Sequence, residues 1–293
     1  MGCVDTLLTL SANAKINLTL DILGTREDGY HEVAMIMQEI SLHDTLSMGK
    51  IDQGVNLTIT IEGQKGTLPA DETNLCWKAA ALVQKEYNLQ EGVEIHLVKR
   101  IPMAAGLAGG SADAAAVLKG MNHLFKLGMT ETRLCELGAK LGSDIPFCLM
   151  GGTMLATGRG EVLTRLPMFP RVSVVLAKPP VGVSTAWAYS TYDAGYVGPH
   201  PDNDAMLEAI DEGNASRAAG LMCNVLEGVT AAEYSVIADY KKLMVDNGAM
   251  ASMMSGSGPT VFGLVQEKHI ARQIADKLKQ FDSEAGVFVA ETL

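Results

Sequence analysis

The N-terminal part of the chain alternates apolar and polar residues, the pattern of a β-strand with one buried face. This alternation runs without a break from Ser11 to Ile22. A turn signal at Glu27 to Gly29 follows, and Val33 to Leu42 is apolar enough for a second strand. We expect Asp44 and Gly49 to end that strand. The pattern therefore predicts a sheet that begins near the N-terminus.

Helical spacing alternates with further strands in the middle of the chain. Val55 to Ile61 continues the β pattern, and Asp71 to Thr73 are residues suited to capping a helix that continues from Leu75. Val93 to Leu97 alternates as a strand and leads into a glycine-rich stretch. A helix over Ser111 to Phe125, rich in Ala and Leu, is predicted to begin directly after that stretch.

The pair of prolines in Leu166 to Pro170 marks the best candidate for a linker, so we predict domains at 1–165 and 166–293. The second domain mixes strands and helices. We predict strands at Val172–Ala177, Met250–Met254, Val261–Val265 and Val287–Glu291, and helices at Asp202–Leu226, Ala231–Val245 and Lys268–Phe281, after a first-domain helix at Glu131–Leu141.

Charge and apolar content exclude several classes of protein. The 293 residues include 23 Lys and Arg against 34 Asp and Glu, a net charge of -11, and no basic run interrupts that balance. A nucleic-acid partner is therefore disfavoured, although local N–H groups and a few lysines can still bind a small anion. No apolar run approaches the ~18 residues that span a bilayer, so we expect no membrane partner.

The cysteines favour a reducing compartment, and we expect a cytoplasmic protein. They are odd in number and form no CxxC pair, which argues against both a disulfide framework and a zinc site. The first residues lack a basic segment and a cleavage pattern, so we expect no signal peptide. Gly2 followed by Thr6 fits the myristoylation pattern only loosely, and we interpret the match as chance. The cysteines are Cys3, Cys76, Cys135, Cys148 and Cys223.

The glycine-rich stretch from Pro102 to Asp113 is the strongest chemical signal. Small residues let a backbone approach a ligand closely, and the first N–H groups of the following helix lack partners, so phosphate is the natural ligand. The stretch has neither the Gly-Lys-Ser/Thr ending of a P-loop nor a GxGxxG pattern. By itself it is equally consistent with a plain strand-to-helix connection.

Three stretches resemble the motifs of the GHMP kinases, a family of small-molecule kinases. They are Ala14 to Leu18, Pro102 to Ser111 and Met254 to Phe262, in the order that the family has them. The resemblance implies an α+β, two-domain GHMP kinase fold, with an N-terminal domain like ribosomal S5 domain 2 and a ferredoxin-like C-terminal domain. It also implies ATP with Mg²⁺ as the phosphoryl donor.

Two further stretches, Gly24 to His31 and Leu141 to Pro146, resemble family members whose substrate carries a cytidine diphosphate group. This resemblance implies transfer of the γ-phosphoryl group to a hydroxyl of that substrate. Two alternatives stay open: another GHMP kinase, such as homoserine or mevalonate kinase, and a catalytically silent nucleotide-binding protein. The sequence assigns no oligomeric state.

The resemblance assigns catalytic roles to Lys15 and Asp144. Lys15 would lie near the acceptor hydroxyl and the transferred phosphate, and Asp144 would accept the hydroxyl proton. From the residues alone, Lys15 and Asn17 would be polar residues on the solvated face of a strand, and Asp144 would cap a short helix. Asn17 is assigned to the substrate.

The remaining substrate residues are aromatic and polar. By resemblance, Tyr30 stacks on cytosine, His31 hydrogen-bonds its edge, Tyr189 covers the other face, and Thr185 contacts the substrate. Without the resemblance, Tyr30 and His31 would be ordinary residues of a loop.

The assigned ATP contacts are the glycine-rich loop and two residues outside it. Asn74 and Lys99 resemble positions that line an adenine pocket, although a helix start and a strand end would explain them equally. The chain has Ser111-Ala112 where the family commonly has two serines, and we assign no Mg²⁺ ligand. The ATP residues are Asn74, Lys99, Pro102, Met103, Ala104, Ala105, Gly106, Leu107, Ala108, Gly109, Gly110, Ser111, Ala112 and Asp113.

Overall fold

A computed structural model describes residues 7–193, 195 and 198–293 of the chain. Cys3 and the Gly2 motif therefore lie outside the described residues. Contacts divide the chain into two compact units. Unit 1 consists of Met1–Ala14, His43–Ile101 and Ala108–Met150, and unit 2 of Lys15–Leu42, Pro102–Leu107 and Gly151–Leu293. Each unit is thus assembled from separated segments, and the predicted division after residue 165 stays a prediction.

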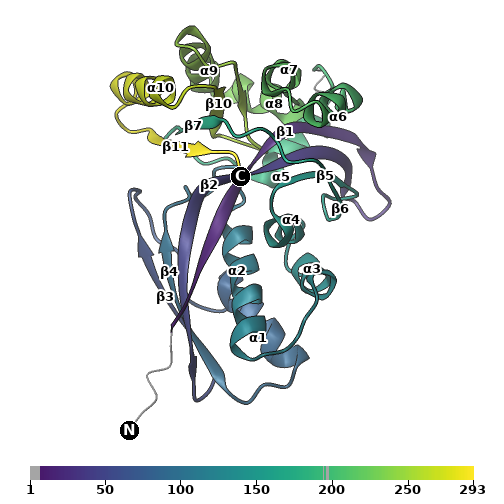
Figure 1. Cartoon of the computed structure of the whole chain (residues 1–293), viewed down its shortest axis with the longest axis vertical. Coiled ribbons are helices and arrows are strands. Elements are labelled where there is room, and N and C mark those ends of the chain that lie inside the picture. Colours follow the sequence, from purple (N-terminus) through teal and green to yellow (C-terminus); the bar gives the residue numbers. More distant parts are fainter. Residues whose placement is uncertain (1–6, 194, 196–197) are drawn as a thin grey trace. The chain divides into compact units, whose positions relative to one another are not determined.

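The strands of the two units, except β8 and β9, are labelled in Figure 1. They are β1 (Leu8–Thr25), β2 (His31–Ile51), β3 (Val55–Ile61), β4 (Gly92–Lys99), β5 (Thr153–Thr157), β6 (Val162–Arg165), β7 (Ser173–Lys178), β8 (Cys223–Asn224), β9 (Ala251–Met254), β10 (Val261–Val265) and β11 (Gly286–Glu291).

None of the helices among the described residues is both long and apolar enough to cross a membrane. They are α1 (Leu75–Glu86), α2 (Gly109–Leu124), α3 (Glu131–Ala139), α4 (Ile145–Met150), α5 (Thr185–Asp193), α6 (Asn203–Asp211), α7 (Ala215–Leu221), α8 (Val225–Glu233), α9 (Val236–Asp246) and α10 (Lys268–Phe281).

In unit 1, helices α1 and α2 pack against the sheet strands β2, β3 and β4 (Figure 1). Strand β4 pairs antiparallel with β2 and parallel with β3. The apolar face of β4 and the buried side of α2 form one core with β2 residues such as Met48. A Cβ at Gly120 of α2 would lie 2.3 Å from the sulfur of Met48, so glycine allows the helix to approach the sheet closely there.

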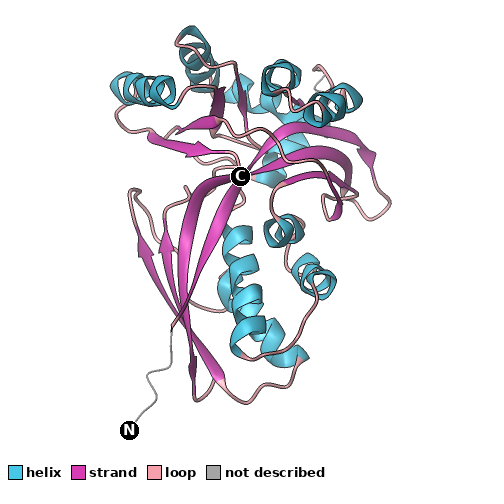
Figure 2. Ribbon diagram, in the orientation of Figure 1, coloured by secondary structure: helices cyan, strands magenta, loops and turns pink. Residues whose placement is uncertain are grey.

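In unit 2, a four-stranded antiparallel sheet has the order β11-β7-β10-β9. Helices α9 and α10 pack on this sheet (Figure 2). The unit also holds the pairing of β2 with β5, of β5 with β6, and the short parallel contact of β1 with β8. Strand β10 and helix α10 have the predicted bounds, because their apolar spacing is unambiguous.

The prediction that Asp44 and Gly49 end the second strand is wrong, since β2 continues through both to Ile51. Asp44 is fully buried, and it accepts hydrogen bonds from the backbone N–H groups of Arg100 and Ile101. A polar residue that breaks an exposed strand can therefore lie inside one when distant segments supply its partners.

Two helix predictions also need correction. The cap of α1 is Asn74 rather than Asp71 to Thr73, because its side chain accepts the Cys76 N–H at 2.8 Å. The single helix predicted over Asp202 to Leu226 is instead α6, α7, β8 and the start of α8. Gly213 has a positive φ of 63°, which ends α6 in a left-handed turn.

Candidate active site

Strand β1 carries Lys15 and Asn17 on the same side, two residues apart. Lys15 is 4% exposed and Asn17 is 0% exposed, and the Lys15 ammonium donates to Asn17 Oδ1 at 2.5 Å. The solvated strand face considered from sequence is therefore wrong at these positions. A buried ammonium requires a partner, and among the described residues the Asn17 amide supplies a neutral one.

The first half of the glycine-rich loop lies beside these residues within unit 2. The Lys15 N–H donates to the Leu107 carbonyl at 3.2 Å, and the Ser255 hydroxyl donates to the Gly106 carbonyl at 3.0 Å. A Cβ at Gly106 would lie 2.1 Å from the Ser255 carbonyl oxygen, and its φ is +73°. Glycine is thus required at position 106 because a side chain would collide there and because the backbone has a positive φ.

The turn at residues 255–258 completes this side of the site. Asn224 donates to the carbonyls of Met254 at 2.9 Å and Gly256 at 2.8 Å, which fixes the turn. A Cβ at Gly256 would lie 3.6 Å from Asn17 Oδ1. Unit 2 therefore brings the first motif, the first half of the second motif and the third motif into one place.

Thr185, at the start of α5, also reaches this turn. Its hydroxyl lies 3.1 Å from the Ser257 hydroxyl. The substrate role assigned to Thr185 stays a prediction, but its position beside the third motif agrees with it.

The loop backbone is strained at two alanines. Ala104 and Ala108 have φ of 48° and 55°, in the left-handed region that favours glycine. Non-glycine residues persist in such conformations when the surrounding structure fixes them, and they gather at ligand sites. Ala108 is also the residue before α2 and has no side-chain oxygen for capping, so the first N–H groups of the helix are left to other acceptors.

The second half of the loop opens α2 in unit 1. A Cβ at Gly109 would lie 2.8 Å from the Lys99 nitrogen and 2.9 Å from Cγ2 of Ile101. A Cβ at Gly110 would meet only Leu75, at an ordinary 3.5 Å. Gly109 therefore serves internal packing, whereas nothing in the fold requires glycine at position 110.

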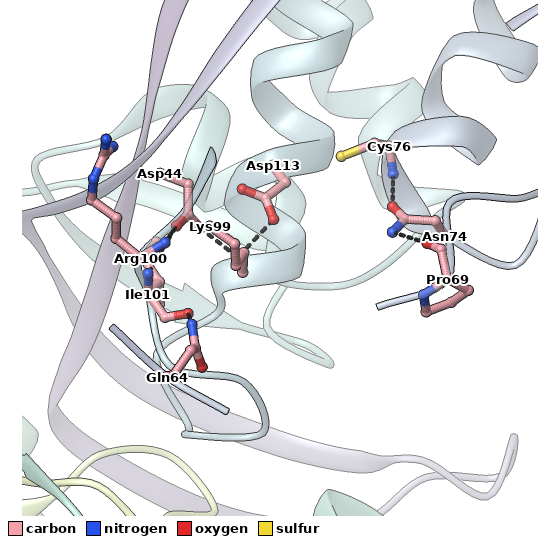
Figure 3. A network of polar contacts seen from close by, with 9 residues as sticks. All are labelled: Asp44, Gln64, Pro69, Asn74, Cys76, Lys99, Arg100, Ile101 and Asp113. Atoms are coloured by element: carbon pink, nitrogen blue, oxygen red, sulfur yellow. Dashed lines mark hydrogen bonds and ion pairs between the residues drawn. The ribbon is translucent and has the colours of Figure 1, made fainter. Parts of the chain in front are cut away.

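Beneath this helix start lies a buried cluster of Asp44, Lys99 and Asp113 (Figure 3). Lys99 Nζ donates to Asp44 and, at 2.7 Å, to Asp113 Oδ2. All three side chains are at most 4% exposed. Lys99 and Asp113 remain predictions as ATP contacts, and the structure gives both a partner inside the protein.

The cluster alters the protonation of Asp113. Burial raises the pKa of Asp113 to about 8, Lys99 opposes the increase, and the negative charge of Asp44 adds to it. Asp113 Oδ1 is buried and accepts no hydrogen bond from the described residues, so the charged form of this carboxyl is poorly solvated.

His31 and Tyr189 form a pair in unit 2, with ring centroids 4.8 Å apart and ring planes inclined by 37°. His31 Nε2 lies 2.8 Å from Asp193 Oδ1, at the end of α5. The Arg159 guanidinium lies 4.9 Å from the ring centroid of the exposed Tyr30. Three of the residues assigned to cytosine are thus held in the same unit.

Asp144 and Asn74 belong to unit 1, and both stand at helix starts. Asp144 directly precedes α4, and its carbonyl accepts the Cys148 N–H at 3.1 Å. Asn74 caps α1 and donates to the Pro69 carbonyl at 2.8 Å. The structural role considered from sequence is therefore present for Asn74, and the ATP and catalytic roles of the two residues stay predictions.

The sequence reasoning assigned no role to Asp44, Asp193, Ser255 or Ser257. The two serines belong to the third glycine-rich motif, which offered the same signal as the loop. Asp44 and Asp193 have no local signal, because their partners lie 55 and 162 residues away in the sequence.

Family models and near full-length relatives establish the family. The model for the N-terminal domain of GHMP kinases matches residues 74–152, and the model for their C-terminal domain matches residues 206–283. The chain belongs to the GHMP kinase family, and the predicted two-domain fold is confirmed.

Two near full-length relatives carry the same name. The 4-diphosphocytidyl-2-C-methyl-D-erythritol kinase of Acetivibrio thermocellus is 48% identical, over 98% of this chain and 99% of its own. The kinase of the same name from Caldicellulosiruptor saccharolyticus is 46% identical, over 94% of each chain.

Solved structures agree with the fold. A crystal structure of 4-(cytidine 5'-diphospho)-2C-methyl-D-erythritol kinase has a TM-score of 0.82 and 32% identity, over 97% of this chain and 99% of its own. A homoserine kinase from Cytophaga hutchinsonii has a TM-score of 0.78 and 20% identity, over 100% of this chain and 96% of its own. This likeness shows the shared fold alone.

Proposed function

We propose that this chain uses ATP to phosphorylate the 2-hydroxyl of 4-diphosphocytidyl-2-C-methyl-D-erythritol, giving the 2-phosphate and ADP in the non-mevalonate route to isoprenoid precursors. The observation that carries the proposal is the buried Lys15 on β1, whose backbone N–H donates a hydrogen bond to the glycine-rich loop. A fixed positive charge beside a phosphate-binding loop is what phosphoryl transfer requires. The shared name of the relatives supports the choice of substrate.

In this proposal Lys15 offsets the negative charge that develops on the transferred phosphoryl group and the acceptor oxygen. Asn17 orients the ammonium through the 2.5 Å hydrogen bond. Asp144 accepts the proton of the hydroxyl as the new bond forms. The loop N–H groups hold the triphosphate, so catalysis consists mainly of positioning and charge stabilisation.

The cytosine end of the substrate binds at Tyr30, His31 and Tyr189. The two rings of His31 and Tyr189 already lie 4.8 Å apart, and Tyr30 is exposed. An aromatic face for stacking and a ring nitrogen for the base edge are the groups that recognise a pyrimidine.

Mg²⁺ accompanies ATP in this proposal. The described residues contain no cluster of His, Cys, Asp or Glu that could hold a metal by itself, and both buried carboxylates beneath α2 are occupied by Lys99. The ion would therefore be held chiefly by the nucleotide phosphates, as Mg²⁺ commonly is. The described cysteines form no disulfide, which is consistent with the cytoplasm as the place of action; they are Cys76, Cys135, Cys148 and Cys223.

An ADP-release assay over a panel of alcohols tests the proposal. We expect turnover with the cytidine diphosphate substrate and none with homoserine, mevalonate or the free methylerythritol phosphate. Activity that does not require the cytidine group would indicate another kinase of the family. Binding of ATP without ADP release for any alcohol would indicate a catalytically silent protein.

A further inference from the structure

The cluster of Asp44, Lys99 and Asp113 connects three segments of unit 1 around the glycine-rich loop (Figure 3). Asp44 lies on β2, Lys99 is the last residue of β4, and Asp113 lies in the second turn of α2. The loop begins directly after β4 and ends where α2 begins. The cluster therefore joins the strand before the loop to the helix after it.

Asp44 fixes the chain at the entrance to the loop. Its Oδ1 accepts the N–H groups of Arg100 and Ile101, the latter at 2.8 Å, while its Oδ2 accepts the ammonium of Lys99. These bonds determine where the chain leaves β4, because Ile101 immediately precedes Pro102. The carboxylate is fully buried, so water cannot replace these bonds.

Lys99 fixes the start of α2 from below. Its ammonium bonds Asp113 at 2.7 Å and lies 2.8 Å from the point where a Cβ of Gly109 would be. The helix start thus rests on the ammonium, and the absence of a side chain at Gly109 permits this approach.

The charges of the cluster do not balance unless it holds a proton. Two carboxylates and one ammonium would leave one negative charge buried below the helix start, and an uncompensated buried charge is strongly unfavourable. One proton on Asp113 makes the cluster neutral.

We propose that Asp44, Lys99 and Asp113 are positioning residues for the phosphate loop, and that the loop binds nucleotide tightly only while the cluster is neutral. This inference rests on the proposed role of the loop in ATP binding. Loss of the proton would place a negative charge about 6 Å along the helix axis from Gly109, since Asp113 follows it by four residues. A negative charge near a helix start opposes the binding of phosphate.

The groups facing Asp113 agree with this assignment. They are Asp44 on β2, Lys99 on β4 and the Cys76 thiol on α1. Burial raises the pKa of Cys76 well above its usual value, so this thiol stays neutral and adds no charge. Burial also raises the pKa of Asp113 to about 8, so the proton is bound at pH 7 and is lost over the next two pH units.

The test compares the KM for Mg-ATP of the wild type and of Asp113→Asn from about pH 7 to about pH 9. Asparagine copies the neutral carboxyl and cannot lose the proton. We expect the wild-type KM to rise on the order of tenfold over this range, and the KM of Asp113→Asn, whatever its value at pH 7, to show no such rise. Glu94 is an exposed carboxylate on the same strand as Lys99. Glu94→Gln is therefore the charge control, and its KM for Mg-ATP should change with pH as that of the wild type does.

Two results would overturn the inference: a wild-type KM that is flat over this range, or an Asp113→Asn KM that rises as the wild type does. If the cluster had only a structural role, Asp113→Asn would change thermal stability, but its KM for Mg-ATP would still depend on pH. The KM for the alcohol substrate, measured in parallel, should not follow the same profile. Calorimetric binding of ATP without the alcohol should show the same pH dependence as the KM. Because this measurement does not involve the alcohol, it distinguishes failure of this inference from failure of the proposed substrate.

If Asp113→Asn does not fold, the wild type alone decides the question. Infrared spectroscopy should show a protonated buried carboxyl at pH 7 that disappears as ATP affinity falls. If no protonated carboxyl is seen at pH 7, the inference is wrong.

Discussion

Gly106, Gly109 and Gly110 occur within five residues of sequence and are glycine for different reasons. Gly106 is fixed by its positive φ and by the Ser255 carbonyl, and Gly109 by the Lys99 ammonium beneath it. Gly110 is exposed, and a Cβ there would make only an ordinary 3.5 Å contact with Leu75. A missing side chain that the fold does not need is explained by close approach of a ligand.

We therefore predict that Gly110→Ala folds normally and binds ATP poorly. Alanine favours a helix over glycine by up to about 1 kcal/mol, so stability should be unchanged or higher. The added methyl group would keep phosphate from the N–H groups at the helix start, and the KM for ATP should rise about tenfold or more. Thermal unfolding and steady-state kinetics measure the two effects.

Gly109→Ala is the matched control for that experiment. Its Cβ would collide with buried atoms of Lys99 and Ile101, so we expect a loss of stability of about 1 to 3 kcal/mol. Equal kinetic behaviour of Gly110→Ala and the wild type would show that nucleotide does not approach this residue.

Lys15 and Asp144 carry the chemistry in the proposed mechanism. We predict that Lys15→Met and Asp144→Asn each lower kcat by about 10²- to 10⁴-fold while the protein stays folded. Both replacements are close in size to the original residue, so packing is preserved. Near wild-type turnover in either variant, measured by ADP release, would remove that residue from the mechanism.

If His31 contacts cytosine as proposed, Asp193 would determine how the His31 ring is presented to the substrate. A carboxylate 2.8 Å from Nε2 holds the proton on that nitrogen, which leaves Nδ1 of the neutral ring as an acceptor. An acceptor pairs with the amino group of cytosine and not with the carbonyl oxygen of uracil. Asp193 would thus contribute to base selection without touching the base.

We predict that Asp193→Ala reduces the preference for cytidine over uridine diphosphate substrates by about tenfold, because the two ring tautomers then become accessible. The ratio of kcat/KM for the two substrates measures this effect. The KM for ATP serves as the control and should not change, and an unaltered preference would exclude Asp193 from base selection.

At the scale of elements, Asn74 at the start of α1 has a capping role that can be tested separately from its predicted role in nucleotide binding. Both ends of the Asn74 amide are engaged, with the Cys76 N–H and the Pro69 carbonyl. We predict that Asn74→Ala lowers stability by about 1 kcal/mol and that Asn74→Ser, which can still cap, restores it.

The KM for ATP of the same two variants tests the adenine contact. Chemical denaturation gives the stability and kinetics give the KM. A raised KM in Asn74→Ser, in which the cap is kept, would identify Asn74 as a nucleotide contact. An unchanged KM there would leave capping as its sole role.

For the whole molecule, the raised pKa of Asp113 predicts how stability depends on pH. The folded protein keeps a proton up to about pH 8 that the unfolded chain releases near the ordinary value of an aspartate. Stability should therefore fall as pH rises from about 5 to about 8, with a slope of up to about 1.4 kcal/mol per pH unit from this group.

Urea unfolding of the wild type and Asp113→Asn at several pH values measures this contribution as the difference between the two proteins. The variant should gain stability relative to the wild type as pH rises. Other groups that titrate in this range, such as histidines, are common to both proteins and cancel. A constant difference across the range would contradict a proton held at Asp113.

Local sequence was sufficient where the pattern is strong and the contacts are close in sequence. Strand β3, strand β10 and helix α10 have the predicted bounds, and the loop does lie between a strand and a helix. The order of three motifs was enough to indicate the kinase family. Residue type and spacing along one element determine such features, so no knowledge of the fold was needed.

Tertiary structure decided which polar residues are buried and which residues they bond, because the partners are distant in sequence. The polar side of β1 is buried since Thr19 bonds Asn203, 184 residues later, and Asp21 bonds His200, 179 residues later. Asp44 stays inside β2 because Lys99, at the end of β4, and the next two residues, Arg100 and Ile101, supply its donors. The sequence by itself determined that a glycine-rich loop precedes a helix. Only folding decided which of its glycines pack against the protein and which is exposed.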